Sequence, residues 1–288
     1  MFVASKGFRS DGHQYIAKAL ELGAAAILVQ DAPEQPLAEN VSVWQCEDTR
    51  AALARIAAVW HGHPERQLKL IGVTGTNGKT TVTHLIRHVL EQNGEKCGLI
   101  GTNGVFFGDI ARESARTTPE SLELYGILRE MVDAGMTCAA MEVSSHSLAL
   151  DRVLGLRFAA AAFTNLTQDH LDYHKSVDNY LRAKKKFFDD MPKDAFCLTN
   201  LDDKNGMVMT QNTRAKVYTY SLRSLSDFKG KLLESHFEGM ILEFNNRELS
   251  VQFIGKFNAS NLLAVYGTAC LLGKKPEDVL LALSSLQP

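Results

Sequence analysis

Short apolar runs alternate with helical patterns through most of the chain, and this alternation restricts the possible folds more than any other feature. The apolar run LKLIGV begins at Leu68 and precedes a helical pattern over Lys79–Gln92, and CGLIGT, TCAAMEV and FAAAAFTNL follow with a further helical pattern over Pro119–Ala134. Apolar strands joined by helices are typical of a parallel sheet that helices cover on both faces. We therefore predict an α/β fold built on a mostly parallel, doubly wound sheet.

The pattern changes after Thr199. The runs KVYTYS, MILEF and ELSVQFIG are interpreted as antiparallel strands appended to the main sheet, with Asn245-Asn246 as a hairpin turn between the last two. Two closing helices are predicted over 258–272 and 276–285, and Pro276 suits the first turn of the second.

The beginning of the chain predicts a smaller α/β unit. Its elements are strands over Phe2–Ala4 and Ala26–Val29 and helices over Tyr15–Leu22 and Thr49–Trp60. These are too few for a complete domain, and the polar segment HPERQ at 63–67 has the composition of a linker. A length of 288 residues suits two domains at about 150 residues each. We expect a partial N-terminal domain over 1–66 and a central domain over 67–288.

Composition excludes several classes of protein. A formal net charge of -2 argues against a general nucleic-acid-binding protein, because such proteins usually carry a basic excess. The five cysteines form no CxxC pair, so neither a zinc site nor a disulfide framework is expected. The start lacks the apolar run of a signal peptide, and no stretch reaches the roughly 18 apolar residues of a membrane span. We expect a cytoplasmic protein without a membrane span.

The segment TGTNGKTT at Thr74–Thr81 joins an apolar strand to a helix, as a phosphate-binding loop requires. Small residues allow backbone N–H groups to converge on phosphate oxygens at a helix N-terminus, where a lysine adds a cation and a threonine hydroxyl can bind Mg²⁺. The strict GxxxxGK[ST] spacing is missed, because Val73 stands where that pattern has glycine. A simple Gly-Asn turn capping a helix is the alternative. We predict ATP contacts from Gly75, Thr76, Asn77, Gly78, Lys79, Thr80 and Thr81.

Polar side chains follow the next strands at the points where those strands end. Glu142 ends TCAAMEV and precedes Ser144, Ser145 and His146, and a carboxylate there suits Mg²⁺ beside the phosphates. FAAAAFTNL leads to the run DHLDYH at 169–174, which is dense in possible metal ligands. The later run of Lys184, Lys185 and Lys186 has the ordinary interpretation of a solvated helix face.

Several motifs in this order resemble the Mur ligase family, and within it the UDP-N-acetylmuramoyl-tripeptide synthetases. They are TGTNGKTT, TTPES, MEVSSHSLALDRV, FTNLTQDHLDYH, YLRAK and GKFNASN, and they cover nearly the whole chain. The resemblance implies that ATP activates the terminal carboxylate of UDP-N-acetylmuramoyl-L-alanyl-D-glutamate as an acyl phosphate. An incoming amine, on L-lysine or meso-diaminopimelate, then forms the amide during peptidoglycan synthesis.

The resemblance also implies roles for the catalytic residues. Lys79 contacts the β- and γ-phosphates, Thr80 and Glu142 hold one Mg²⁺, and His170 binds a second. Lys184 matches the family lysine that CO₂ converts to a carbamate, an anionic ligand for the second metal, whereas Lys185 and Lys186 have no such role. The resemblance therefore replaces the interpretation as a solvated helix face for Lys184 alone.

The remaining binding positions also come from the resemblance. Asn258 and Asn261 match residues that contact adenine. Leu150 departs from the family pattern, because some relatives have glutamine at this position. Hydroxyl and guanidinium groups suit a polyanionic UDP-muramoyl peptide, and the matching positions are Thr117, Thr118, Ser144 and Arg152, with Phe8, Arg9 and Ser10 in a loop for the uridine end.

Family members begin earlier and continue beyond Pro288 into a third domain, which recognises the amino acid. The expectation is therefore a chain truncated at both ends, without the C-terminal domain and inactive alone. Two alternatives remain: another Mur-type ligase, of the folylpolyglutamate or cyanophycin synthetase type, or a non-catalytic nucleotide-binding remnant. The sequence does not distinguish lysine from diaminopimelate as the added residue, and a monomer is the expected state.

Overall fold

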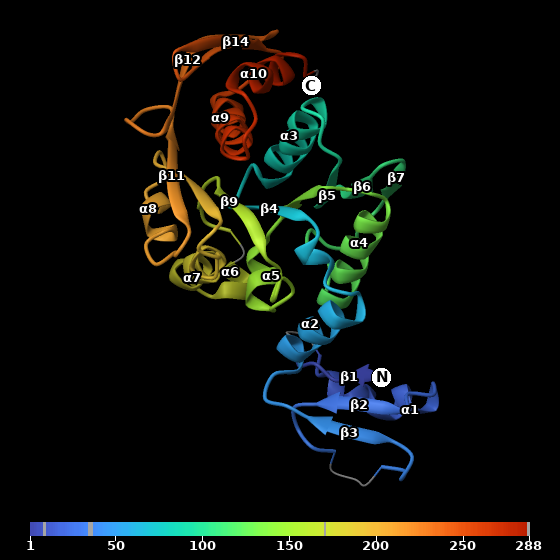
Figure 1. Cartoon of the computed structure of the whole chain (residues 1–288). Helices are drawn as coiled ribbons and strands as arrows, with labels where there is room; N and C mark the ends of the chain where they lie inside the picture. Colours follow the sequence, from blue (N-terminus) through green and yellow to red (C-terminus); the bar gives the residue numbers. More distant parts are fainter. Residues whose placement is uncertain (8–9, 34–36, 170, 287–288) are drawn as a thin grey trace.

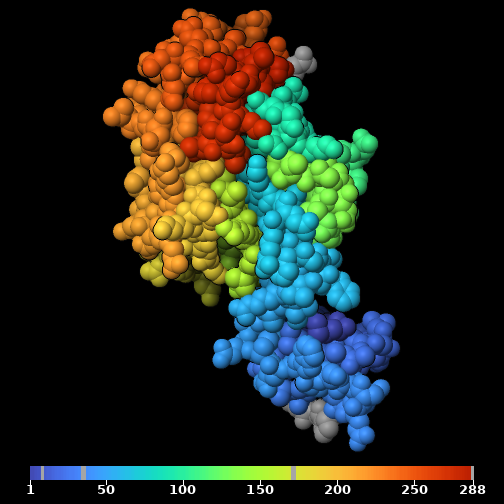
Figure 2. Space-filling model, viewed as in Figure 1, coloured from blue at the N-terminus to red at the C-terminus, as the bar shows by residue number. Residues whose placement is uncertain are grey.

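Two sheets organise the chain. The computed structural model describes residues 1–7, 10–33, 37–169 and 171–286, and it contains a three-stranded and an eleven-stranded sheet. The small sheet lies in a separate lobe below the large one, and α2 (Thr49–Trp60) lies between them (Figures 1 and 2). None of the helices in these described segments combines the length and apolar character that crossing a membrane requires.

The small sheet is parallel, with the order β1-β2-β3. Its strands are β1 (Phe2–Val3), β2 (Ala26–Val29) and β3 (Ser42–Gln45), and β3 was not predicted. The helix predicted over Tyr15–Leu22 is α1 (Ile16–Glu21), and a 3₁₀ turn over Gly12–Tyr15 precedes it. Asp48 caps α2 by accepting bonds from two backbone N–H groups, and α2 packs against α4 (Ser121–Asp133) of the large unit.

The large sheet has the order β14-β13-β12-β11-β10-β9-β4-β8-β5-β6-β7. Its strands are β4 (Lys69–Thr74), β5 (Cys97–Gly101), β6 (Gly104–Phe107), β7 (Ile110–Arg112), β8 (Cys138–Glu142), β9 (Phe158–Phe163), β10 (Phe196–Asn200), β11 (Lys216–Ser221), β12 (Phe228–His236), β13 (Gly239–Phe244) and β14 (Arg247–Val251). All pairs from β12 through β5 are parallel, so the carboxyl ends of β9, β4 and β8 meet at one edge. The predicted α/β class is confirmed.

Helices cover both faces of the large sheet, as doubly wound topology requires. Alternate residues of β4 enter different cores: Ile71 and Val73 pack with α3 (Lys79–Gln92), α9 (Lys256–Leu271) and α10 (Pro276–Ser284). Leu70 packs on the opposite face with α4 and α7 (Val177–Asp189). The shorter helices are α5 (Ser145–Ala149), α6 (Leu171–His174) and α8 (Gly206–Met209), with a 3₁₀ turn at Pro64–Arg66.

The prediction for the last strands was partly wrong. KVYTYS, which is β11, pairs in parallel with β10 and not antiparallel, because α8 provides a crossover between the two strands. The antiparallel part is β12-β13-β14, and Asn245 and Asn246 form its tight turn with φ values of 48° and 65°, as predicted. The hairpin β6-β7 and the strands β10 and β12 were not predicted.

Candidate active site

The phosphate loop joins β4 to α3, and two of its glycines are required by close packing. Gly75 and Gly78 have φ values of 151° and 86°. A Cβ atom at Gly75 would lie 1.9 Å from Thr164 Oγ1, and one at Gly78 would lie 2.5 Å from Asn261 Oδ1. Only glycine therefore fits at either position.

The loop that follows β9 holds the phosphate loop in place. Thr76 donates its backbone N–H to the Asn165 carbonyl at 2.8 Å, and Asn77 donates its own to Asn165 Oδ1 at 3.0 Å. In return, Thr164 Oγ1 donates to the Asn77 carbonyl at 2.7 Å, and Thr167 donates its N–H to Thr76 Oγ1 at 2.9 Å. These reciprocal bonds rigidify a segment that is otherwise irregular.

Lys79 begins α3 and turns back over the loop. Its Nζ donates to the carbonyls of Gly75 and Thr76 at 2.9 Å and 2.8 Å. Burial lowers the pKa of Lys79, while the negative charges of Glu142 and Asp169 act in the opposite direction. The ammonium group is therefore desolvated at the point where a phosphate would arrive.

Glu142, at the end of β8, is almost completely buried and is held by hydroxyl and N–H donors. Its Oε1 accepts from Thr80 Oγ1 at 3.0 Å and from the Thr102 backbone N–H at 2.8 Å, and its Oε2 accepts from Thr102 Oγ1 at 3.3 Å. Gly101 makes room for this carboxylate, since a Cβ there would lie 2.5 Å from Glu142 Oε1. Sequence reasoning missed Thr102; its only signal was a position directly after a buried strand.

The three lysines of α7 lie in different environments. Lys184 is 1% exposed, its Nζ donates to the Gly75 carbonyl at 2.8 Å and lies 4.7 Å from the centre of the Tyr180 ring. Burial, and then the charge of Lys79, lower the pKa of Lys184 well below its ordinary value. Lys185 pairs with Asp189 at 2.5 Å and Lys186 pairs with Asp151 at 2.6 Å. Lys184 alone of the three faces the phosphate loop.

The residues expected to bind the UDP substrate lie close together beside the end of β8. Thr118 Oγ1 donates to the Glu142 carbonyl at 2.8 Å and to Ser144 Oγ at 3.4 Å, and Arg152 Nη1 donates to the Thr118 carbonyl at 3.1 Å. Thr117 Oγ1 lies 3.0 Å from Thr102 Oγ1. Hydrogen bonds of 2.8–3.4 Å therefore connect this group to Glu142 and its neighbour Thr102.

One cleft of about 670 Å³ contains both groups of residues. Its lining comes from the phosphate loop, the ends of β5 and β8, the segment 114–118, α5 and the residues after it, and α7. The lining residues are Thr76, Asn77, Gly78, Lys79, Thr80, Thr102, Ser114, Ala115, Arg116, Thr117, Thr118, Glu142, Ser144, Ser145, His146, Arg152 and Lys184. Most of the predicted site residues, which come from distant parts of the sequence, thus lie in one cleft. Arg116 also lines this cleft, although it was not predicted.

Other candidates lie elsewhere. Asn261 is beside Gly78, and its Nδ2 donates to Asn258 Oδ1 at 3.3 Å, but neither asparagine lines the cleft. Thr81 is half-buried in the first turn of α3. Ser10 is exposed in the small lobe, and its carbonyl accepts the Gly7 N–H at 2.9 Å. Phe8, Arg9 and His170 lie outside the described residues. His174, from the same polar run as His170, is buried with its Nε2 2.9 Å from Ser145 Oγ.

The sequence and the fold were compared with known proteins. Residues 73–269 match the Mur ligase middle domain, and residues 1–61 match the catalytic domain of the Mur ligase family. A UDP-N-acetylmuramoyl-L-alanyl-D-glutamate–2,6-diaminopimelate ligase from Bacteroides thetaiotaomicron is 60% identical over all 288 residues, and the protein of that name from Cytophaga hutchinsonii is 46% identical over 287 residues. The chain spans 60% and 59% of the lengths of these relatives.

Solved structures agree with this result. A structure of a UDP-N-acetylmuramoyl-L-alanyl-D-glutamate–2,6-diaminopimelate ligase has a TM-score of 0.86 at 26% identity, over 99% of this chain and 60% of the other. The MurF ligase from Thermotoga maritima in complex with ADP shares the fold, with a TM-score of 0.65 at 20% identity over 99% of this chain and 62% of the other. The middle-domain match contains the phosphate loop, Glu142 and Lys184, and on this basis the chain belongs to the Mur ligase family.

Proposed function

We propose that this chain carries the nucleotide-binding and UDP-substrate-binding parts of an ATP-dependent ligase of peptidoglycan synthesis. The substrate would be UDP-N-acetylmuramoyl-L-alanyl-D-glutamate and the added residue meso-diaminopimelate. The observation that carries the proposal is the single cleft that joins Lys79 and Glu142 to Thr118 and Arg152. The names of relatives 60% and 46% identical support diaminopimelate rather than lysine. We assign the UDP end of the substrate mainly to residues 1–66 and ATP to residues 67–288.

The phosphate loop fits ATP. Gly78 lines the cleft at the start of α3, whose N-terminus favours anions, Gly75 lets the loop pack closely against Thr164, and Lys79 supplies a desolvated cation. Thr76, Asn77, Thr80 and Thr81 complete the contacts, and Asn258 and Asn261 would approach adenine from the start of α9.

The donor set beside this loop also fits Mg²⁺. Thr80 and Glu142 present a hydroxyl and a carboxylate oxygen 3.0 Å apart, and hard oxygen ligands with bound phosphates are what Mg²⁺ prefers. When bound, the metal would neutralise charge that develops during phosphoryl transfer.

A second metal would be held by His170 and by Lys184 as a carbamate. The Lys184 amine is buried, and its lowered pKa favours the neutral form that attacks CO₂. A new N–C bond forms, the amine loses one proton, and a cationic side chain becomes an anionic oxygen ligand.

The residues of the cleft would position the reactants of two successive reactions. The terminal carboxylate of the substrate attacks the γ-phosphorus of ATP, ADP leaves, and an acyl phosphate remains; the amine then attacks the acyl carbon, phosphate leaves and an amide forms. Thr117, Thr118 and Ser144 would hold the muramoyl peptide beside the γ-phosphate, Arg152 would bind the same substrate nearer its UDP end, and Phe8, Arg9 and Ser10 would hold the uridine. Positioning and charge neutralisation contribute most to such chemistry.

Ligand-dependent unfolding tests the proposal. Addition of UDP-N-acetylmuramoyl-L-alanyl-D-glutamate, or of Mg-ATP, at a hundredfold excess over its Kd should raise the unfolding free energy by about 2.7 kcal/mol. Lys79→Met should abolish only the ATP response, and Thr118→Val should weaken only the response to the UDP substrate. A response to dihydrofolate instead of the UDP substrate would favour a folylpolyglutamate-type ligase, and no response to any of them would favour a non-catalytic remnant.

The added amino acid is tested separately. ATP-dependent ligation by the full-length gene product should consume meso-diaminopimelate in preference to L-lysine, measured as release of phosphate and as the mass of the product. Preference for lysine would overturn this part of the proposal while leaving the ATP and UDP-substrate assignments unchanged.

A further inference from the structure

Three arginines converge on one carboxylate at the edge of the cleft. Arg152 Nη2 lies 2.8 Å from Glu120 Oε1, Arg116 Nε lies 3.6 Å from the same oxygen, and Arg50 Nη1 lies 3.6 Å from Glu120 Oε2. Among the residues that the structure describes, no second carboxylate forms an ion pair with these arginines. Three positive charges against one negative leave an excess of two.

The three side chains come from different parts of the molecule. Arg50 is in the first turn of α2, the helix that leads from the small lobe, and its Nε donates to the Lys6 carbonyl at 3.2 Å. Arg116 and Arg152 line the cleft, and Glu120 caps the start of α4. The arginine cluster, Arg50, Arg116 and Arg152, therefore lies between the lobe of residues 1–60 and the cleft.

The cluster has unused donors. Arg152 directs Nη1 to the Thr118 carbonyl and Nη2 to Glu120, and its buried Nε has no hydrogen-bond partner. The 3.6 Å contacts of Arg50 and Arg116 are too long for hydrogen bonds, so Glu120 organises these groups without saturating them. Burial lowers the pKa of Arg152, the charge of Glu120 opposes this shift, and the smaller effects of Arg116 and Arg50 lower the pKa further, so each guanidinium lies in the field of the others. A cleft lined by charges of one sign attracts ligands of the opposite sign, so this cluster favours an anion.

We propose that the arginine cluster is a subsite for the diphosphate of the nucleotide-linked substrate, with Arg50 as a binding residue that no family motif indicated. This inference rests on the proposed function. A diphosphate diester carries one negative charge on each phosphate, which equals the excess of the cluster. In the proposed pose the uridine lies on the small lobe and the muramoyl peptide in the cleft, and the diphosphate is the part of the ligand that connects them. Guanidinium groups also match phosphate oxygens in geometry.

Calorimetric titration of Arg50 variants tests the subsite. Arg50→Gln should weaken binding of UDP-N-acetylmuramoyl-L-alanyl-D-glutamate about tenfold, because a charge-assisted contact is lost, and should leave the Kd for Mg-ATP unchanged. Arg50→Lys keeps the charge and should recover part of the loss. Arg55→Gln, an exposed position on the same helix, is the matched control and should bind like the wild type. Thermal unfolding of each variant reports whether the contact with Lys6 was needed for folding.

Titration with UDP-N-acetylglucosamine shows which part of the ligand Arg50 contacts, because this compound contains the diphosphate but no peptide carboxylate. The same fold-loss with this probe supports the diphosphate subsite. A loss confined to the dipeptide substrate, or equal affinities for Arg50→Gln and the wild type, would overturn it. Failure of the wild type to bind the dipeptide substrate would instead refute the proposed function.

Discussion

At the scale of the residue, position on a helix decides which lysine of α7 faces the cleft. Successive residues of a helix point about 100° apart, so Lys184, Lys185 and Lys186 cannot share one environment. Lys184 is directed at the Gly75 carbonyl, whereas its neighbours pair with acidic side chains near the surface. The consequence is a buried amine, and burial destabilises the native state while this amine is protonated.

The unfolding free energy should depend on pH through the titration of the Lys184 amine. Because the folded-state pKa of Lys184 is below its unfolded value of 10.5, both states hold the proton at low pH and the cost of burying the charge is fully present. As the pH rises through the folded-state pKa the native state releases the proton first, so the cost disappears. The wild type should gain stability relative to Lys184→Met by up to about 1.4 kcal/mol per pH unit in that window. Urea unfolding in CO₂-free buffer measures it, and a pH-independent difference would contradict the prediction.

Glu142 should control the effect of magnesium on nucleotide binding. Glu142→Gln replaces a carboxylate oxygen that faces Thr80 and Thr102 by an amide group, so the increase in ATP affinity on adding Mg²⁺ should fall by about tenfold or more. Titration calorimetry with and without Mg²⁺ measures this increase. Glu91→Gln, at the exposed far end of α3, is the control and should retain it. An unchanged magnesium effect in Glu142→Gln would place the metal elsewhere.

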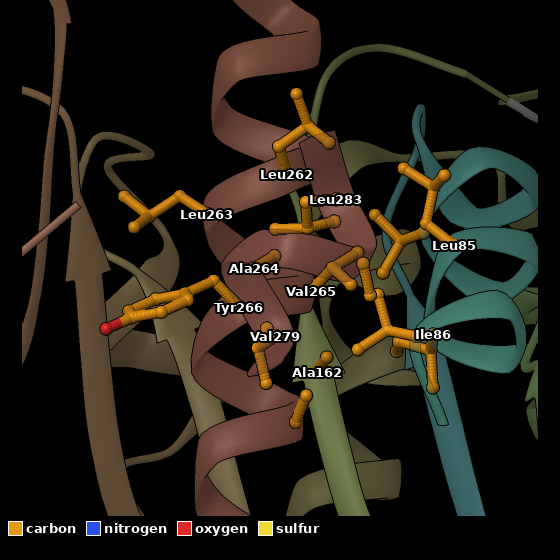
Figure 3. Close-up of a cluster of buried hydrophobic side chains, with 14 of the residues drawn as sticks. Leu85, Ile86, Ala162, Leu262, Leu263, Ala264, Val265, Tyr266, Val279 and Leu283 are labelled. Carbon is orange, nitrogen blue, oxygen red and sulfur yellow. The ribbon is translucent and has the colours of Figure 1, made fainter. Parts of the chain in front are cut away.

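At the scale of the element, α9 and α10 close one face of the large sheet. Figure 3 shows Leu262, Val265 and Leu283 meeting Leu85 and Ile86 of α3, so the C-terminal helices pack directly on the helix that begins at the phosphate loop. This packing fixes the position of α3, and with it that of Lys79 and Thr80.

Two leucines of α10 should differ in their contribution to stability. Leu283 is fully buried in this core, so Leu283→Ala should lower the unfolding free energy by about 2–5 kcal/mol through lost contacts and a residual cavity. Leu281 is 72% exposed on the same helix, and Leu281→Ala should change it by about 0.5 kcal/mol or less. Urea denaturation compares the two; equal effects would mean that α10 is not packed as described.

Glycine and alanine at position 246, in the β13-β14 turn, should affect stability differently. Asn246 has a φ of 65°, which costs a residue with a Cβ atom about 1–2 kcal/mol when no side-chain bond compensates. Asn246→Ala should therefore be less stable than the wild type, whereas Asn246→Gly should be close to it. Thermal unfolding ranks the three, and an alanine variant as stable as the glycine variant would rule out the left-handed turn.

At the scale of the whole molecule, the two sheets have unequal cores. The small sheet rests on a cluster of four buried residues, Ala4, Ile16, Ile27 and Val29, whereas two extensive clusters enclose the large sheet. Small cores bury too little apolar surface for high local stability.

Hydrogen exchange should therefore proceed in a defined order. Amides of β2 should exchange faster than those of β4 and β8, because local opening of the small lobe costs less free energy than opening of the central strands. Mass spectrometry of exchanged peptides measures this, and a UDP-linked substrate that spans both units should slow exchange in β2. Equal protection of β2 and β4 in the ligand-free protein would contradict the prediction.

Local patterns determined much of this protein. The helices α3 and α2 were predicted with the bounds observed, because apolar periodicity, glycine positions and capping residues act within one or two turns of the chain. Glu142 was identified because it is the last residue of a buried strand, and a continuous apolar run makes such a strand recognisable in the sequence. The role proposed for Lys184 came from the family motif and not from its charge pattern.

Contacts between distant segments were decided only by the tertiary structure. The direction of β11 depends on its pairing with β10, and pairing partners are not encoded within the strand itself. Thr102 reaches Glu142 across forty residues, and Arg50 reaches Glu120 across seventy. Local sequence specifies which elements form, whereas the direction and neighbours of each strand, and the groups that meet in the cleft, follow from burying those elements together in one sheet.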